Sequence, residues 1–360
     1  MGYPTHAGST RIARWKDALG RLGLVLAGLV FFTLSLQLMR EGIAPLGVWF
    51  HTVLAFNSPA KALGFGWLFA SIALSGSPVA ATAISFFDAG ILTQAQTFAM
   101  IAGSRLGASF IVLVVGFAHR LRGHQRALSY SAGLLSLLVT QSTYIIALPL
   151  GLALLRLDWL AAGGLNVTDV ASPFELFLAP ALRVIAELLP TWTLFPFGFL
   201  VLLGSFRLFD RALPDLHLEE SRAAGINRLL YRPVVSFLLG GLVTAVTLSV
   251  SVSMSLLVPL SVRGYIRQEN IIPYAMGANI TTFIDTLVAA ALIGNPAAVT
   301  VVLVEMISVG AVALTILLLG YRPYQSAIGR LSLAVGSSPA RLAVYLLAIF
   351  LIPVLLFLGG

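Results

Sequence analysis

The sequence has no cysteine and little charge, and both absences restrict what the chain can be. Without cysteine among its 360 residues, it has no disulfide, no thiolate metal site and no cysteine nucleophile. Charged residues make up 10% of the chain, whereas a soluble domain carries about 25%. Hydrophobic residues make up 58%, and the mean hydropathy is +0.96. Too few polar residues remain to cover a water-facing surface, which excludes a soluble enzyme and most nucleic-acid-binding proteins.

Lysine is also scarce, since Lys16 and Lys61 are the only lysines in a chain whose net charge is +8. An excess of basic residues is typical of the cytoplasmic loops of membrane proteins. The expected partner of these charges is therefore a lipid bilayer and not a nucleic acid. By the same rule, we expect two basic clusters to be cytoplasmic: Arg11, Arg14, Lys16 and Arg21, and then Arg120, Arg122 and Arg126.

Long apolar runs are what the sequence has in abundance. Residues 22–39, 299–319 and 342–358 each approach the roughly 20 residues that an α-helix needs to cross a bilayer. We therefore predict an all-α polytopic membrane protein, multi-pass in the inner (plasma) membrane of the cell. The chain has no Gly-x-x-x-x-Gly-Lys-Ser/Thr loop, so we expect neither an ATP-driven pump nor another enzyme, and no cofactor.

Two apolar stretches are broken by small polar residues before they reach the length of a span. Residues 62–74 stop at Ser75-Gly76-Ser77-Pro78 and resume as 79–87, and residues 234–248 stop at Ser249-Val250-Ser251-Val252-Ser253. We expect each break to be the tip of a re-entrant helical hairpin, because neither half is long enough to span. Freed backbone is tolerated at membrane depth only where it is buried in protein or lines a polar cavity.

The two breaks belong to a plan that occurs twice. An offset of 174 residues pairs Ser75 with Ser249, and it also pairs Leu74/Leu248, Ser77/Ser251, Gly90/Gly264, Gln94/Gln268 and Gly103/Gly277. Each half then has an apolar stretch interrupted by small residues, at 103–109 and at 277–282. Gly/Ser interruptions at corresponding positions of two halves are typical of a transporter site at the bilayer midplane. We predict two inverted-topology repeats, each with a re-entrant helical hairpin and an interrupted transmembrane helix.

Four segments follow from this plan. They are a cytoplasmic N-terminal tail (1–21), transmembrane repeat 1 (22–160), an amphipathic connector (161–192) and transmembrane repeat 2 (193–360). The two hairpin tips are expected to approach each other near the midplane.

At the breaks, the chain resembles the type II sodium-dependent phosphate cotransporters and their bacterial relatives. The resemblance is sharpest at Gly277-Ala278-Asn279-Ile280-Thr281-Thr282, and it extends to Thr247-Leu248-Ser249-Val250-Ser251-Val252, Ala73-Leu74-Ser75-Gly76-Ser77-Pro78 and Gly103-Ser104-Arg105-Leu106-Gly107-Ala108. The chain departs from the family pattern in three places. Ser75 and Ser249 stand for the hairpin glutamines, Arg105 for the first asparagine, and Glu305 for the asparagine of a later stretch.

The breaks and the family motif together suggest two sets of site residues. Hydroxyls and backbone N–H groups can replace the hydration shell of an oxyanion, and oxygen atoms can ligate Na⁺. The substrate-binding set is Ser75, Ser77, Arg105, Ser249, Ser251, Ser253 and Asn279, and the ion-binding set is Ser104, Thr281, Thr282 and Asp285.

Simpler structural readings of these residues stay open. The serines can bond their own helix backbone. Arg105 binds an anion or pairs with Asp88, and Asp285 is a cation or proton site or pairs with Arg105.

The resemblance implies a secondary transporter that takes up inorganic phosphate or a related anion by alternating access, with Na⁺ as the coupling ion. Two other functions are open. One is a sodium-independent anion transporter of the same fold, driven by protons or by exchange. The other is a non-transporting membrane subunit with a degenerate site. A homodimer is also left open.

Overall fold

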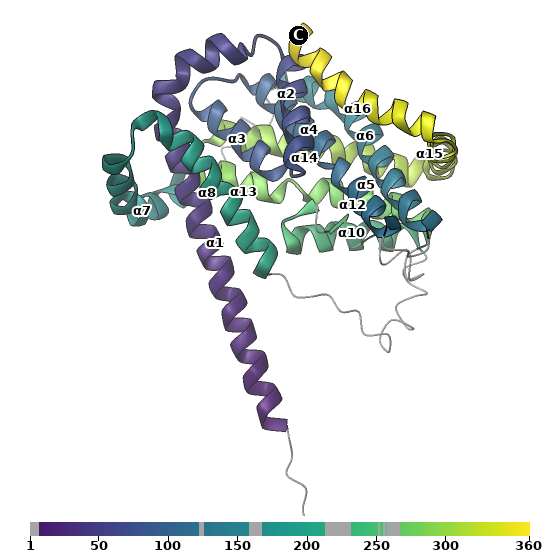
Figure 1. Cartoon of the computed structure of the whole chain (residues 1–360), viewed down its shortest axis with the longest axis horizontal. Coiled ribbons are helices and arrows are strands. Elements are labelled where there is room, and N and C mark those ends of the chain that lie inside the picture. The colour runs from purple at the N-terminus through teal and green to yellow at the C-terminus, as the bar shows by residue number, and fades with distance from the viewer. Residues whose placement is uncertain are drawn as a thin grey trace, which may run out of the picture.

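A computed structural model of the chain describes residues 7–121, 126–157, 168–212, 232–250, 253–254, 257 and 267–360. These residues form helices and no β-strand (Figure 1). Arg122, Ser251 and Gly264, named above, lie outside them. Seven helical stretches are long and apolar enough to cross a bilayer: Asp17–Ile43, Gln94–Phe117, Ala132–Leu155, Thr191–Ala212, Glu269–Ile293, Pro296–Leu319 and Pro339–Gly359. The predicted all-α polytopic membrane protein is confirmed.

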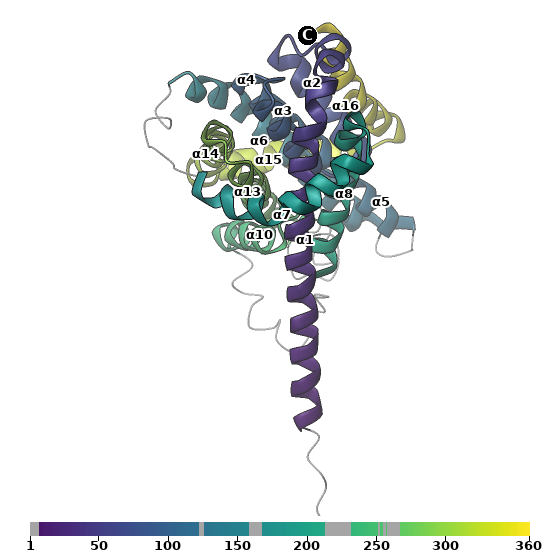
Figure 2. The same cartoon turned by 90° about the vertical axis from the view of Figure 1, so that its left-hand side faces the viewer.

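The first helix, α1 (Ala7–Trp49), has 43 residues and begins well before the apolar run that predicted it. Its N-terminal part extends beyond the other helices (Figures 1 and 2). Residues 9–19 are mostly good helix formers without proline, so the helix continues into the segment expected to be a separate tail. Its other end packs closely on α8 (Thr191–Ala212), where the Cα of Gly42 approaches the backbone of Phe195.

The first predicted break is present between α2 (Pro59–Ala73) and α3 (Ser77–Asp88). Helix α2 begins at the capping residue Ser58, whose hydroxyl accepts a hydrogen bond from the backbone of Lys61. It ends where Leu74 adopts a left-handed conformation with φ of +52°. That region costs a residue with a Cβ about 1–2 kcal/mol, so surrounding structure must hold the turn in place.

The second break repeats this geometry 174 residues later. Helix α10 (Pro233–Thr247) also has 15 residues and a proline in its first turn, and it ends at Leu248 with φ of +50°. Neither α2 nor α10 reaches the roughly 20 residues of a full span. The sequence thus placed both helix ends correctly.

Each short helix packs on an interrupted one: α2 on α4 (Gln94–Ala108), and α10 on α12 (Gln268–Thr281). In both pairs a glycine lies so close to a carbonyl oxygen of the facing helix that a Cβ would overlap it. These contacts are Gly66 with Met100 and Gly240 with Tyr274, and then Gly103 with Leu63 and Gly277 with Phe237. Glycine and carbonyl residue are shifted by 174 in both cases, so the two helix pairs pack in the same register.

The two interrupted helices resume after a short break. Helix α4 is followed at Ser109 by α5 (Phe110–Leu121), and α12 is followed at Thr282 and Phe283 by α13 (Ile284–Ile293). The breaks therefore fall at the C-terminal ends of the two predicted interruptions.

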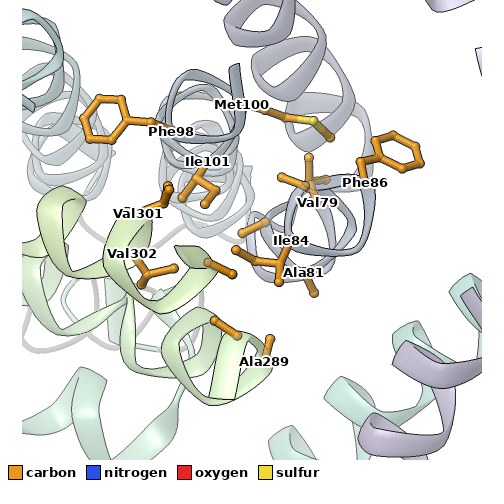
Figure 3. Packing of buried hydrophobic residues seen from close by; sticks show 14 of the residues in the cluster. Val79, Ala81, Ile84, Phe86, Phe98, Met100, Ile101, Ala289, Val301 and Val302 are labelled. Atoms are coloured by element: carbon orange, nitrogen blue, oxygen red, sulfur yellow. The ribbon is translucent and has the colours of Figure 1, made fainter. Parts of the chain in front are cut away.

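Apolar side chains from both halves pack together in the centre. Figure 3 shows α3 and α4 meeting α13 and α14 (Pro296–Leu319) through Ile84, Ile101, Ala289 and Val301. The remaining helices are α6 (Arg126–Leu155), α7 (Thr168–Leu188), α15 (Tyr321–Gly336) and α16 (Pro339–Gly359), with a π-helical turn at Phe50–Leu54 after α1. Helix α7 lies in the predicted connector. Exposed leucines along α16, such as Leu347, fit a lipid-facing surface.

Candidate functional site

Both helix breaks contribute to one small internal cavity of about 10 Å³. Its walls come from the α2–α3 turn, the end of α4, α6, the segment after α10, and the end of α12. The lining residues are Gly76, Ser77, Arg105, Ala108, Ser109, Thr140, Tyr144, Val250, Asn279 and Thr282. A cavity of this size has room for about one water molecule, so this conformation is closed around the site.

The offset that relates the two helix pairs also relates residues across the cavity. Three pairs of lining residues are separated by 174 positions: Gly76 and Val250, Arg105 and Asn279, and Ala108 and Thr282. Each member of a pair therefore meets its counterpart at the same place.

Arg105 is the only charged residue in the lining, and it is 4% exposed. Its Nη2 lies 3.0 Å from Oδ1 of Asp285 and also donates to the Thr286 hydroxyl. The guanidinium carbon lies 5.1 Å from the centre of the Phe283 ring, a cation–π contact. Its Nε has no hydrogen-bond partner among the described residues. The guanidinium is thus held firmly at one nitrogen and left unsatisfied at another.

Of the two partners that the sequence left open for Arg105, Asp285 is correct and Asp88 is wrong. Asp88 Oδ2 lies 3.0 Å from Arg40 Nε, and its Oδ1 accepts a hydrogen bond from the Asn295 side chain at 3.0 Å. Asp88 ends α3 away from the cavity, where the partly exposed Arg40 reaches it.

The carboxylate of Asp285 is also only partly satisfied. Oδ1 accepts hydrogen bonds from the Thr286 backbone and hydroxyl as well as from Arg105. Oδ2 is buried without a partner among the described residues, and the same is true of the Thr282 hydroxyl. Three unsatisfied polar atoms, on Arg105, Asp285 and Thr282, therefore gather at one end of the cavity and its adjoining ion pair.

The opposite wall is built by α6 and α12. The Asn279 side-chain nitrogen lies 3.1 Å from the Thr140 hydroxyl, and Tyr144 donates to the Asn279 carbonyl at 3.0 Å. The Tyr144 ring also approaches Phe283 at 6.0 Å between centroids. These bonds fix the amide of Asn279 at the cavity.

Glu305, on α14, is a further acidic group near this cluster. It is 1% exposed, and its Oε2 is buried without a partner among the described residues. Arg105 and Tyr144 are the residues that act on it or respond to it electrostatically.

Several predicted site residues are engaged elsewhere. The hydroxyl of Ser104 donates to the Ile101 carbonyl at 2.7 Å in its own helix, and that of Thr281 donates to the Gly241 carbonyl at 2.8 Å. Ser253 accepts from Thr244 at 2.7 Å and lies 3.1 Å from the Tyr274 hydroxyl. Ser75 and Ser249 are half-buried in the breaks but do not line the cavity, and Ser251 lies outside the described residues. Ser77, Arg105, Asn279 and Thr282 do line it.

Sequence reasoning missed Thr140, Tyr144, Ser109 and Thr286. The only signal for the first two is a short polar stretch inside the apolar helix α6, which has no counterpart at the offset of 174. Ser109 and Thr286 directly follow or adjoin motif residues, and their roles depend on where the breaks turn the chain.

Taken together, the cluster offers one guanidinium, two carboxyl groups and several hydroxyls. Arg105 and Thr282 can donate hydrogen bonds to an oxyanion, and Asp285 and Glu305 can hold a cation or a proton. Comparisons of the chain with family models, with curated proteins and with solved structures gave no match.

Proposed function

We propose that the protein is a secondary transporter of a small oxyanion, built from two inverted-topology repeats whose hairpins and interrupted helices meet at one site. The observation that carries the proposal is the set of unsatisfied polar atoms on Arg105, Thr282 and Asp285 beside a cavity lined by both halves. An unsatisfied buried polar group costs about 1–3 kcal/mol, and more when it is charged. A ligand that satisfied all three would offset this cost.

The repeat is supported by three independent matches at one offset. The left-handed residues Leu74 and Leu248, the glycine contacts of the two helix pairs and the three residue pairs of the cavity all differ by 174. Inverted repeats would place the site at the bilayer midplane, where both sides of the membrane can reach it in turn.

An oxyanion fits the positive part of the site. Helix α3 begins at the cavity with Gly76 and Ser77, and a helix N-terminus attracts negative charge through its free N–H groups. Arg105 adds a planar guanidinium with an unsatisfied N–H, which suits tetrahedral or planar oxyanions. Inorganic phosphate is the substrate that the family resemblance favours, in the inner (plasma) membrane.

The sodium site is less well supported by the geometry than the anion site. Of its four expected ligands, Ser104 and Thr281 donate their hydroxyls to backbone carbonyls. Thr282 and Asp285 are the two that keep an unsatisfied oxygen.

Purified protein in liposomes would test the proposal through uptake and exchange of labelled phosphate, with and without Na⁺. We expect labelled phosphate to enter vesicles that contain unlabelled phosphate. If neither uptake nor exchange occurs with phosphate, sulfate or another small oxyanion, the proposal is wrong and the non-transporting subunit is the better reading.

Arg105→Lys tests the anion contact without removing the charge that Asp285 needs. An ammonium cannot reproduce the guanidinium fork, so we expect the phosphate affinity to fall about tenfold, or about 1.4 kcal/mol. Arg40→Lys is the matched control, because it makes the same change at the peripheral pair with Asp88. Equal affinities in the two variants would reject Arg105 as the anion ligand.

A further inference from the structure

Glu305 is a carboxyl group at mid-membrane depth with no function in the proposal above. It is the tenth residue of the 24-residue helix α14. At 1.5 Å per residue it lies about 15 Å from the start of the helix, which is half the thickness of a ~30 Å hydrocarbon core. A carboxyl group buried so deeply is ordinarily a functional one.

Glu305 has no counter-charge of its own. Arg105 on α4 is the cation that acts on it, and the Nη2 of Arg105 is already bonded to Asp285 on α13 at 3.0 Å. Tyr144 on α6 is the other titratable group that faces it, and its hydroxyl donates to the Asn279 carbonyl. Among the described residues, the cluster therefore contains one cation and two carboxyl groups.

This imbalance decides what must accompany an anion. Arg105 and Asp285 compensate each other, so an ionised Glu305 and a bound oxyanion would leave two uncompensated negative charges in a closed, buried site. Uncompensated buried charge is strongly unfavourable, and a carboxyl group in such a place takes up a proton instead. One proton on Glu305 removes one of the two charges.

We propose that Glu305 is the proton carrier that couples anion transport to the proton gradient, which makes this protein a proton–anion symporter. The inference rests on the proposed transport function. The carboxylate takes a proton from the side on which the anion binds, holds it on the unpartnered Oε2 while Arg105 holds the anion, and releases it on the other side. The proton that enters therefore leaves with the anion, and the carboxylate is regenerated.

The described geometry favours a proton over Na⁺ as the coupling ion. A hard cation is held by several oxygen ligands, whereas Thr282 and Asp285 provide one unsatisfied oxygen each. The cavity of about 10 Å³ also leaves little room for a hydrated ion. A proton needs only one oxygen atom, and Glu305 has it.

The test uses the full chain in liposomes without Na⁺, labelled phosphate outside and a pH-sensitive dye inside. A gradient of about one pH unit is worth about tenfold in accumulation for one proton per anion. We expect wild-type vesicles to accumulate phosphate toward that limit and to acidify inside as they do so. Glu305→Gln should abolish the response to the gradient and retain exchange of labelled for unlabelled phosphate. Glu187→Gln, which changes an exposed carboxyl group on α7, should behave like wild type.

Phosphate itself binds protons near neutral pH, but it does so equally with both proteins, so the difference between variants reports on Glu305. Accumulation driven by Na⁺ and not by the pH gradient, or an unchanged gradient response in Glu305→Gln, would overturn the proposal. If Glu305→Gln does not fold, the dye signal of wild type decides, because phosphate entry without proton entry contradicts it. Absence of exchange in wild type would instead reject the transport function itself.

Discussion

The helix pairs α2/α4 and α10/α12 have the same packing and different chemistry. In each pair two glycines lie against carbonyl oxygens of the facing helix, and the short helix ends in a left-handed leucine. At the cavity the pairs differ, because α4 presents Arg105 where α12 presents Asn279. The close helix contact depends on glycine, whereas the side chains at the cavity end can differ without disturbing it.

This difference makes the site asymmetric in charge. The first pair supplies the only cation of the lining, and the second supplies a neutral amide and, at Thr282, a hydroxyl. Asp285 belongs to α13, beyond the second pair, and its bond to Arg105 joins the two halves of the chain. The ion pair is thus the strongest polar link across the pseudo-symmetric centre.

The largest expected effect comes from breaking that link. Arg105→Met leaves Asp285 buried without a counter-charge, and removing one member of a buried pair costs about 3–5 kcal/mol. Arg105→Met with Asp285→Asn removes both charges, so we expect most of this loss to be recovered. The free energy of unfolding in detergent micelles, from denaturant titration of the three variants, measures both effects. A double variant as unstable as Arg105→Met would mean that the pair does not link the halves in this way.

A smaller effect is expected from filling the shared glycine contacts. A Cβ at Gly103 or Gly277 overlaps a carbonyl oxygen of the partner helix, and such overpacking costs about 1–3 kcal/mol. Because the register is the same, Gly103→Ala and Gly277→Ala should lose similar amounts in the same unfolding assay. Gly204→Ala on α8 is the control, since nothing lies within 4 Å of that position. Loss at one site alone would show that the two pairs are packed differently.

The sequence predicted the parts of this molecule that depend on local signals. Small polar residues at the breaks predicted where α2 and α10 end, because a helix that meets serines, glycine and proline within a few residues loses its backbone bonds. Length and apolarity predicted the membrane spans. The first helix was underestimated, since polar residues with good helix propensity extend α1 to Ala7.

The candidate site was predicted only in part, because its contacts join residues far apart in the chain. Arg105 and Asp285 were named, and so was their pairing, but as one of two alternatives. Tyr144 reaches Asn279 across 135 positions, a contact that no periodicity reveals. Ser104 and Thr281 were named from the family motif, yet the rotation of their helices turns them toward backbone carbonyls.

The smallest predicted effect sharpens the comparison at a place where the two pairs solve one contact differently. Gly107 packs directly against the Trp67 carbonyl, and 174 residues later the hydroxyl of Thr281 donates to the Gly241 carbonyl at 2.8 Å. Thr281→Val keeps the shape and removes the bond, which is worth about 0.6 kcal/mol between membrane helices. Thr300→Val is the control, because Thr300 bonds only its own helix backbone, at Pro296.

A loss near this value by denaturant titration would mean that close glycine packing carries the second pair as it carries the first, with the hydroxyl as a minor addition. A loss above about 2 kcal/mol would mean that the second pair depends on this hydrogen bond, so the two pairs would share a register without sharing the cause of their stability. No loss of stability, combined with a changed dependence of phosphate uptake on Na⁺, would instead return Thr281 to the ion-binding set. That outcome would also count against the proton as the coupling ion, because a threonine hydroxyl ligates Na⁺ but does not carry a proton between aqueous phases near neutral pH.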